Sequence, residues 1–185
     1  MSSDGTFPVV IITGPVGVGK TTTAEALGEL LIEHDIPHTM IDMDALTWTY
    51  PRPAGDRFNA RLGLRNLADV TKNGRENGST RLIVAGVIEA RSDRDDYRNV
   101  IPGAEVTVVR LVAPIERIRK RIVLRSSSGA GSEAGVAWEK DRAAELIAIM
   151  DAADVADFSI ETTDREPRDV AREIAEWLGW LPPNP

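Results

Sequence analysis

The sequence predicts an α/β fold in which five parallel strands form one sheet with helices on both faces. The first observation is an alternation: five short apolar runs are separated by segments whose apolar residues recur at helical spacing. The second is a glycine-rich turn between the first apolar run and the first helical segment. Together they predict a three-layer αβα arrangement with ligands at the carboxyl ends of the strands.

The first half of the chain is predicted to supply three strands. Val9–Ile12 is a β-branched run, typical of a buried strand, and Ala24, Leu27 and Leu31 share one face of the helix that follows. The later segments are a second strand at 39–43, a proline-bearing loop at 48–53, a helix at 59–72 and a central strand at 82–88.

The second half is predicted to supply two further strands. Pro114 and Pro167 stand where helices begin, because the first helical turn tolerates proline. The segments are a charged stretch at 91–98, a strand at 106–112, a helix from Pro114, a Ser/Gly-rich stretch at 126–131, a helix at 138–153, a strand at 157–162 and a helix from Pro167 to Gly179.

Length and composition indicate one domain over residues 1–185, with a flexible N-terminus at 1–6. A chain of 185 residues with 42% apolar content can bury one core. Its net charge of -7 weighs against a nucleic-acid or membrane-surface binder, which would need a basic surplus. The chain contains no cysteine, targeting pattern or membrane-length apolar run, so a cytoplasmic protein is expected, either monomeric or homodimeric.

The turn after the first strand carries a complete G-x-x-x-x-G-K-T motif, the P-loop of nucleoside triphosphate sites. Glycines let the backbone N–H groups turn inward around a phosphate, and the next helix points its positive end at the same anion. Lys20 is expected to reach the β- and γ-phosphates, and Thr21 to ligate Mg²⁺. The predicted nucleotide-binding residues are Gly14, Pro15, Val16, Gly17, Val18, Gly19, Lys20, Thr21 and Thr22.

Two other nucleotide-binding classes fit poorly. A GTPase would carry D-x-x-G and N-K-x-D motifs, which the sequence lacks, and Thr22 stands where a dinucleotide-binding loop needs its third glycine. The stretch from Ser126 to Gly131 has the composition of a mobile flap or a passive linker. Its presence in a P-loop protein favours a short lid over about 126–137.

Two aspartates at the end of the second strand are the predicted catalytic carboxylates. The third strand carries no aspartate of the usual second metal-binding motif, and the first carboxylate after it is Glu89. We expect Asp42 to hold a metal-bound water and Asp44 to take or orient the proton of an acceptor hydroxyl. The alternative is that each carboxylate only caps a helix or turn.

Three arginines on the helix after Pro114 could neutralise a transferring phosphoryl group. Arg117, Arg121 and Arg125 stand at successive i+4 steps and lead into the expected lid. A plain charged helix face is the alternative, and we expect one or two of the three to be catalytic. Arg142, beyond the lid, is a weaker candidate.

Several motifs resemble those of small P-loop kinases of the nucleoside monophosphate kinase-like group. The chain is most similar to adenylylsulfate kinases, and more distantly to chloramphenicol phosphotransferase and gluconate kinase. Ile41–Asp44 resembles the family's D-G-D, the stretch at 65–70 resembles its E-N-I-R-R, and the stretch at 91–95 resembles its R-A-D-R-D. The resemblance implies that Asn66, Arg91 and Arg94 face the acceptor and that Thr163 borders the adenine.

The chain also departs from the family pattern on the acceptor side. Residues 85–89 replace the family's F-I-S-P, the long family lid is shortened, and Gly63 replaces an arginine. These departures point away from adenylylsulfate itself. Trp48, Tyr50 and Phe58 could instead line a pocket for an apolar or cyclic molecule, or simply pack a long loop.

The sequence therefore predicts a kinase that uses ATP and Mg²⁺ to phosphorylate a hydroxyl of a small-molecule acceptor. One alternative is a nucleotide or polynucleotide-end kinase, although the acidic net charge weakens the polynucleotide version. Another is a non-catalytic, nucleotide-gated regulatory module.

Overall fold

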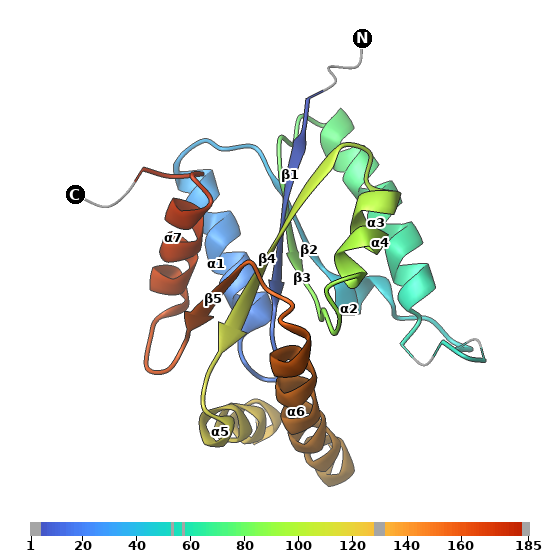
Figure 1. Cartoon of the computed structure of the whole chain (residues 1–185), viewed down its shortest axis with the longest axis vertical. Helices are drawn as coiled ribbons and strands as arrows, with labels where there is room; N and C mark the ends of the chain where they lie inside the picture. The colour runs from blue at the N-terminus through green and yellow to red at the C-terminus, as the bar shows by residue number, and fades with distance from the viewer. Residues whose placement is uncertain (1–4, 53, 57, 128–131, 183–185) are drawn as a thin grey trace.

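The computed structural model describes residues 5–52, 54–56, 58–127 and 132–182. Within these ranges the five strands form a single, entirely parallel sheet in the order β2-β3-β1-β4-β5 (Figure 1). The strands are β1 (Phe7–Thr13), β2 (Thr39–Asp42), β3 (Leu82–Ala85), β4 (Ala104–Val112) and β5 (Phe158–Glu161). The predicted five-stranded parallel sheet is confirmed.

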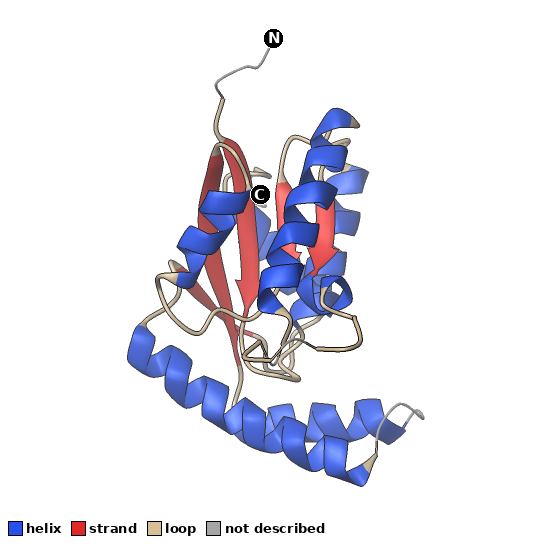
Figure 2. Cartoon of the chain, turned by 90° about the vertical axis from the view of Figure 1, so that its right-hand side faces the viewer, coloured by secondary structure: helices blue, strands red, loops and turns tan. Residues whose placement is uncertain are grey.

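Helices cover both faces and one end of the sheet. The helices are α1 (Lys20–Glu33), α2 (Met43–Leu46), α3 (Ala60–Glu76), α4 (Asp93–Val100), α5 (Ile115–Arg125), α6 (Glu133–Ala153) and α7 (Pro167–Trp177). Helices α1 and α7 pack on one face and α3 and α4 on the other, while α5 and α6 lie side by side beneath the carboxyl ends of the strands (Figures 1 and 2). This is the predicted three-layer arrangement.

The alternating side chains of β1 build two cores, one on each side of the sheet. Val10 and Ile12 pack with the buried residues of α1 and α7, whereas Val9 and Ile11 pack with those of α3 and α4. All four are essentially buried, because a central parallel strand is covered on both faces. The central position of β1 fixes the loop that follows it at the middle of the sheet's carboxyl edge.

Three helices differ from the expectations. No helix was predicted at α2, whose first residue, Met43, ends the expected second strand. The charged stretch at 91–98 forms most of α4, which has a single buried residue, Tyr97, and therefore shows almost no apolar periodicity. Helix α6 begins at Glu133 rather than Trp138, because the Ser132 side chain accepts a hydrogen bond of 3.1 Å from the Gly135 N–H and caps the helix.

The first helical turns of α6 thus occupy 133–137, the second half of the expected lid. Residues 128–131 of that lid, and residues 1–4 of the expected flexible N-terminus, lie outside the described residues. No helix in the described part of the chain has the length and apolar character needed to span a bilayer.

Candidate active site

The loop between β1 and α1 has a backbone that depends on its glycines. Gly14, Gly17 and Gly19 have φ values of 144°, 80° and 110°, in the region that side chains disfavour. A Cβ at Gly14 would lie 2.7 Å from the Leu111 carbonyl oxygen, and one at Gly17 would lie 2.6 Å from the Ile122 side chain. Nothing lies within 4 Å of the corresponding point at Gly19, so this residue faces open space.

Replacing Gly17 with alanine is expected to destabilise the protein by about 2–4 kcal/mol. The positive φ and the clash with buried Ile122 both oppose a methyl group. Gly135→Ala is the matched control, because the same change in the first turn of α6 meets no atom closer than 3.4 Å and should be neutral or stabilising. Urea denaturation of both variants gives the comparison, and equal stabilities would contradict the packing argument.

Lys20 lies at the N-terminus of α1, and its ammonium group folds back over the loop. Its Nζ donates to the carbonyl oxygens of Gly14 and Pro15, each at 3.1 Å. Burial lowers the pKa of Lys20 to about 8, and the nearby carboxylates of Asp44 and Asp42 limit this fall. An anion placed beside this ammonium would favour its charged form.

Nucleotide affinity is therefore expected to fall above about pH 8. Below the ligand-free pKa of Lys20 the ammonium is already charged, whereas above it nucleotide binding must take up a proton. The dissociation constant for ADP should rise by up to about tenfold per pH unit. Calorimetry above about pH 7.5, where the phosphates are fully ionised, tests this, and a flat profile from pH 8 to 9.5 would contradict it.

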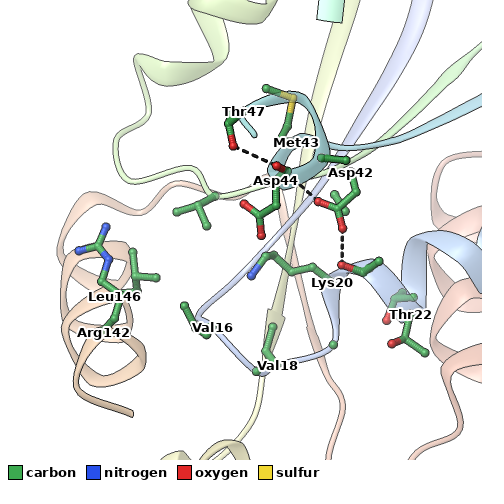
Figure 3. A pocket seen from close by; sticks show the side chains of 18 of the residues that line it. Val16, Val18, Lys20, Thr22, Asp42, Met43, Asp44, Thr47, Arg142 and Leu146 are labelled. Carbon is green, nitrogen blue, oxygen red and sulfur yellow. Dashed lines mark hydrogen bonds between the residues drawn. The ribbon is translucent and has the colours of Figure 1, made fainter. Parts of the chain in front are cut away.

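Asp42 and Asp44 lie beside Lys20 (Figure 3), and hydrogen bonds join them into a polar cluster with Thr21. The Thr21 hydroxyl donates to Asp42 Oδ2 at 2.7 Å, and Asp42 Oδ1 accepts from the Asp44 N–H at 2.9 Å. Asp42 thus caps α2, as the alternative interpretation expected, and also binds the residue predicted to ligate the metal. The Asp44 side chain points toward the Lys20 ammonium and into the cavity (Figure 3).

The oxygen atoms of Thr21 and Asp42 suit Mg²⁺, which prefers hard oxygen ligands. Among the described residues, no group of three or more His, Cys, Asp or Glu side chains could hold a metal by itself. A magnesium ion here would therefore complete its shell with phosphate oxygens and water, as it commonly does in phosphoryl-transfer sites.

A cavity of about 1570 Å³ extends from the P-loop past Asp44. Residues 16 to 22 of the loop and α1, together with residues of α5, the turn after β5 and α7, line one part of it. Residues of α2, α3, α4, α6 and the loops between them line the rest. Trp48 and Phe58 line the cavity, whereas Tyr50 is 95% exposed and lies outside the lining. Gly14 and Pro15 contribute carbonyl groups to Lys20 rather than surface to the cavity.

The three arginines of α5 have different surroundings. Arg121 lines the cavity and donates to the Val18 carbonyl oxygen at 2.9 Å and to the Thr162 carbonyl oxygen at 2.7 Å, joining the P-loop to the end of β5. Arg125 also lines the cavity and pairs with Glu139 at 2.7 Å. Arg117 pairs with Asp164 at 2.8 Å and is not part of the lining. The structure brings two of the three to the site.

The residues expected to face the acceptor lie elsewhere. Asn66 donates to the Leu46 carbonyl oxygen at 2.8 Å and joins α3 to α2. Arg94 pairs with Asp157 at 3.0 Å, and Arg91 lies 3.7 Å from the same carboxylate. None of the three lines the cavity, because Asn66 bonds to α2, while Arg91 before α4 and Arg94 in its first turn are both directed toward the segment between α6 and β5.

The turn after β5 also differs from the expectation. Thr163 hydrogen-bonds through its N–H and hydroxyl to the Glu161 carboxylate, and it does not line the cavity. Its neighbour Thr162 does, held by Arg121. The Arg121–Thr162 contact had no sequence signal, because the two residues are 41 positions apart.

A second contact that could not be predicted from the sequence lies on the cavity wall opposite Asp42 and Asp44 (Figure 3). Arg142 of α6 forms ion pairs with Glu89, which follows β3, and with Glu145 at 2.7 Å. Both Arg142 and Glu89 line the cavity. Arg142 had appeared only as a weak catalytic candidate, and only the packing of α6 against the β3–α4 loop reveals its partner.

The parallel sheet and the phosphate loop at its carboxyl edge define a P-loop nucleotide-binding fold, and the family that matches the sequence places the chain among P-loop kinases. The chain belongs to the adenylylsulphate kinase family, whose sequence model matches residues 7–125. The match ends with α5, so α6 and its cavity-lining residues lie beyond it.

Solved structures with the same fold belong to several kinds of protein. The tunicamycin resistance protein of Deinococcus radiodurans is 23% identical with a TM-score of 0.60, and the match covers 97% of this chain and 99% of that one. Shikimate kinase from Acinetobacter baumannii is 21% identical, with a TM-score of 0.57 over 96% and 95% of the chains. APS kinase from Mycobacterium tuberculosis is 17% identical, with a TM-score of 0.58 over 95% and 99%. These matches support the fold.

Proposed function

We propose that the protein transfers the γ-phosphoryl group of ATP to a hydroxyl group of a small molecule. The observation that carries this proposal is the position of Asp44. Its carboxylate lies beside the Lys20 ammonium, at the point where the cavity continues from the P-loop toward α3 and α4. A kinase needs its base at this boundary, because the acceptor hydroxyl must meet the terminal phosphate there.

The residues of the loop have distinct roles in this reaction. The N–H groups of residues 16 to 21 and the Lys20 ammonium hold the phosphates, and Thr21 and Asp42 hold the magnesium ion. Bound there, Mg²⁺ would neutralise charge that develops on the phosphates. The Arg121 and Arg125 guanidinium groups line the same part of the cavity and supply further positive charge.

The transfer step breaks the bond between the γ-phosphorus and the oxygen that bridges it to the β-phosphate. A new bond forms between the γ-phosphorus and the acceptor oxygen, and ADP leaves with the bridging electrons. The acceptor proton passes to a carboxylate oxygen of Asp44. This carboxylate lies beside the Lys20 ammonium and therefore next to the reacting groups.

The first experiment is acceptor-dependent ADP release. The panel contains adenylylsulfate, nucleoside monophosphates, sugar acids and hydroxylated antibiotics, with Lys20→Ala as the control. Release that needs an acceptor and disappears in the variant would support a kinase and identify its acceptor class. ATP binding without turnover on any acceptor would favour the regulatory module instead.

A nucleotide or polynucleotide-end kinase is the second candidate, supported by the size of the cavity. A polynucleotide acceptor would make the Michaelis constant strongly dependent on salt, because binding would release counterions. A Michaelis constant that does not change with salt would therefore exclude a polynucleotide acceptor.

A further inference from the structure

The part of the cavity beyond Asp44 has largely apolar walls. Its apolar lining comes from α2, the loop before α3, α3 itself, the β3–α4 loop and α6, and includes Met43, Trp48, Phe58, Leu64, Val87 and Leu146. Trp48 is 90% exposed and Phe58 is 47% exposed. Such exposed rings beside an open cavity provide contact area for a ring-bearing ligand.

The positive charge of Arg142, which lies on α6 at this wall, is already neutralised by neighbouring carboxylates. The Arg142 side chain is only 13% exposed and is paired with both Glu89 and Glu145. Its guanidinium also lies over the Phe58 ring, 5.7 Å from the ring centroid. Figure 3 shows Arg142 and Leu146 on the wall opposite Asp42 and Asp44. A ligand anion would have to compete with two carboxylates for this arginine.

The remaining charges on the acceptor side are mostly negative. Asp93 and Asp96 of α4 line the cavity together with Glu89, and Asp93 accepts bonds of 2.8 Å from the N–H groups of Glu89 and Ala90. Arg52, on an exposed loop, is the other acceptor-side arginine among the described lining residues. Arg91 and Arg94 are directed toward Asp157 and away from the cavity.

We propose that the acceptor is an uncharged hydroxyl compound with an apolar, ring-bearing body, and that Glu89 determines this specificity by neutralising Arg142. The proposal rests on the phosphotransferase function above. A carboxylate or sulfate on the acceptor would lie among the carboxylates of Glu89, Asp93 and Asp96. The guanidinium group of Arg142 is already paired, so an anionic acceptor would be repelled. An uncharged molecule meets no such penalty and gains the contacts of the aromatic wall.

The test is a binding measurement with the phosphate site filled by saturating Mg²⁺ and ADP. The probes are shikimate and its methyl ester, which differ by one charge, and gluconate as a second anion, all measured by NMR titration. Wild type should bind the ester at least as well as shikimate. Glu89→Gln should bind shikimate and gluconate at least about tenfold more tightly than wild type, because it frees a charged donor for the anion.

Two further variants identify the residue responsible. Glu145→Gln is the matched control: this carboxylate also pairs with Arg142 but does not line the cavity, so anion affinity should change by less than about threefold. Adding Arg142→Gln to Glu89→Gln should abolish the gain. Circular dichroism establishes that each variant is folded.

The outcomes separate this inference from the proposed function. Tighter binding of shikimate than of its ester by wild type, or no gain in Glu89→Gln, would overturn the specificity claim even if the protein is a kinase. An absence of acceptor-dependent ADP release would count against the kinase, whereas the gain of anion binding in Glu89→Gln requires no turnover. Phosphorylation of an anionic acceptor in preference to uncharged ones would preserve the kinase and refute the inference.

Discussion

Replacing Asp44 with asparagine is expected to reduce acceptor-dependent turnover by about 10²–10⁴-fold, the usual effect of losing a positioned proton acceptor. Asparagine keeps the size of the side chain, and the backbone bond from the Asp44 N–H to Asp42 is unaffected. The affinity for ATP should therefore change little. The measurement is steady-state ADP release together with calorimetric ATP binding near pH 7.

The choice of pH matters because Asp44 also raises the pKa of Lys20 against the effect of burial. Without this carboxylate the pKa of Lys20 should fall further, and near pH 8 the variant would lose ATP affinity for an indirect reason. Asp42→Asn is a useful comparison. It should weaken the bond to Thr21 and raise the Mg²⁺ concentration needed for activity. Full turnover in Asp44→Asn would exclude Asp44 as the base.

The sheet could be predicted because its central strands β1, β3 and β4 are largely buried apolar runs and most of the connecting helices carry regular apolar stripes. Val10 and Ile83 pair in the register, and both are fully buried, so the apolar runs alone located these strands. Helices α2 and α4 escaped prediction for the opposite reason. Helix α2 has four residues and no buried side chain, and α4 buries only Tyr97. Apolar periodicity cannot reveal a helix that buries almost nothing.

Site residues could be predicted where they lie close together in the sequence, and not where they are brought together only by folding. The P-loop and the Asp42–Asp44 pair could be located because each occupies a few consecutive positions at a strand end. The pairing of Arg142 with Glu89, 53 positions apart, depends on how α6 crosses the end of the sheet. The resemblance placed Arg91 and Arg94 at the acceptor, but the nearby Asp157 binds them instead.

The second large effect is expected for Lys20→Ala, which should weaken ATP binding by about 10²-fold. In the proposed site the lysine would provide charge-assisted hydrogen bonds to the phosphates from a half-buried position, and such bonds are stronger than neutral ones. Calorimetric titration with ATP measures the loss. An affinity within about threefold of wild type would show that Lys20 does not bind the nucleotide.

The same substitution should leave the ligand-free protein at least as stable as wild type near pH 7. The pKa of Lys20 is about 8 in the folded protein and 10.5 as the reference value, so folding with a charged lysine costs up to about 3 kcal/mol below pH 8. This cost disappears as the pH rises from 8 to 10.5. Lys20→Ala avoids the cost but also loses the hydrogen bonds to the carbonyl oxygens of Gly14 and Pro15, which reduces the stability that the variant gains. Wild type should therefore gain stability relative to Lys20→Ala over that range. Urea denaturation at several pH values checks the difference. A variant that binds no ATP but is stable when ligand-free would show that the lysine is retained for phosphate binding at a cost to the fold.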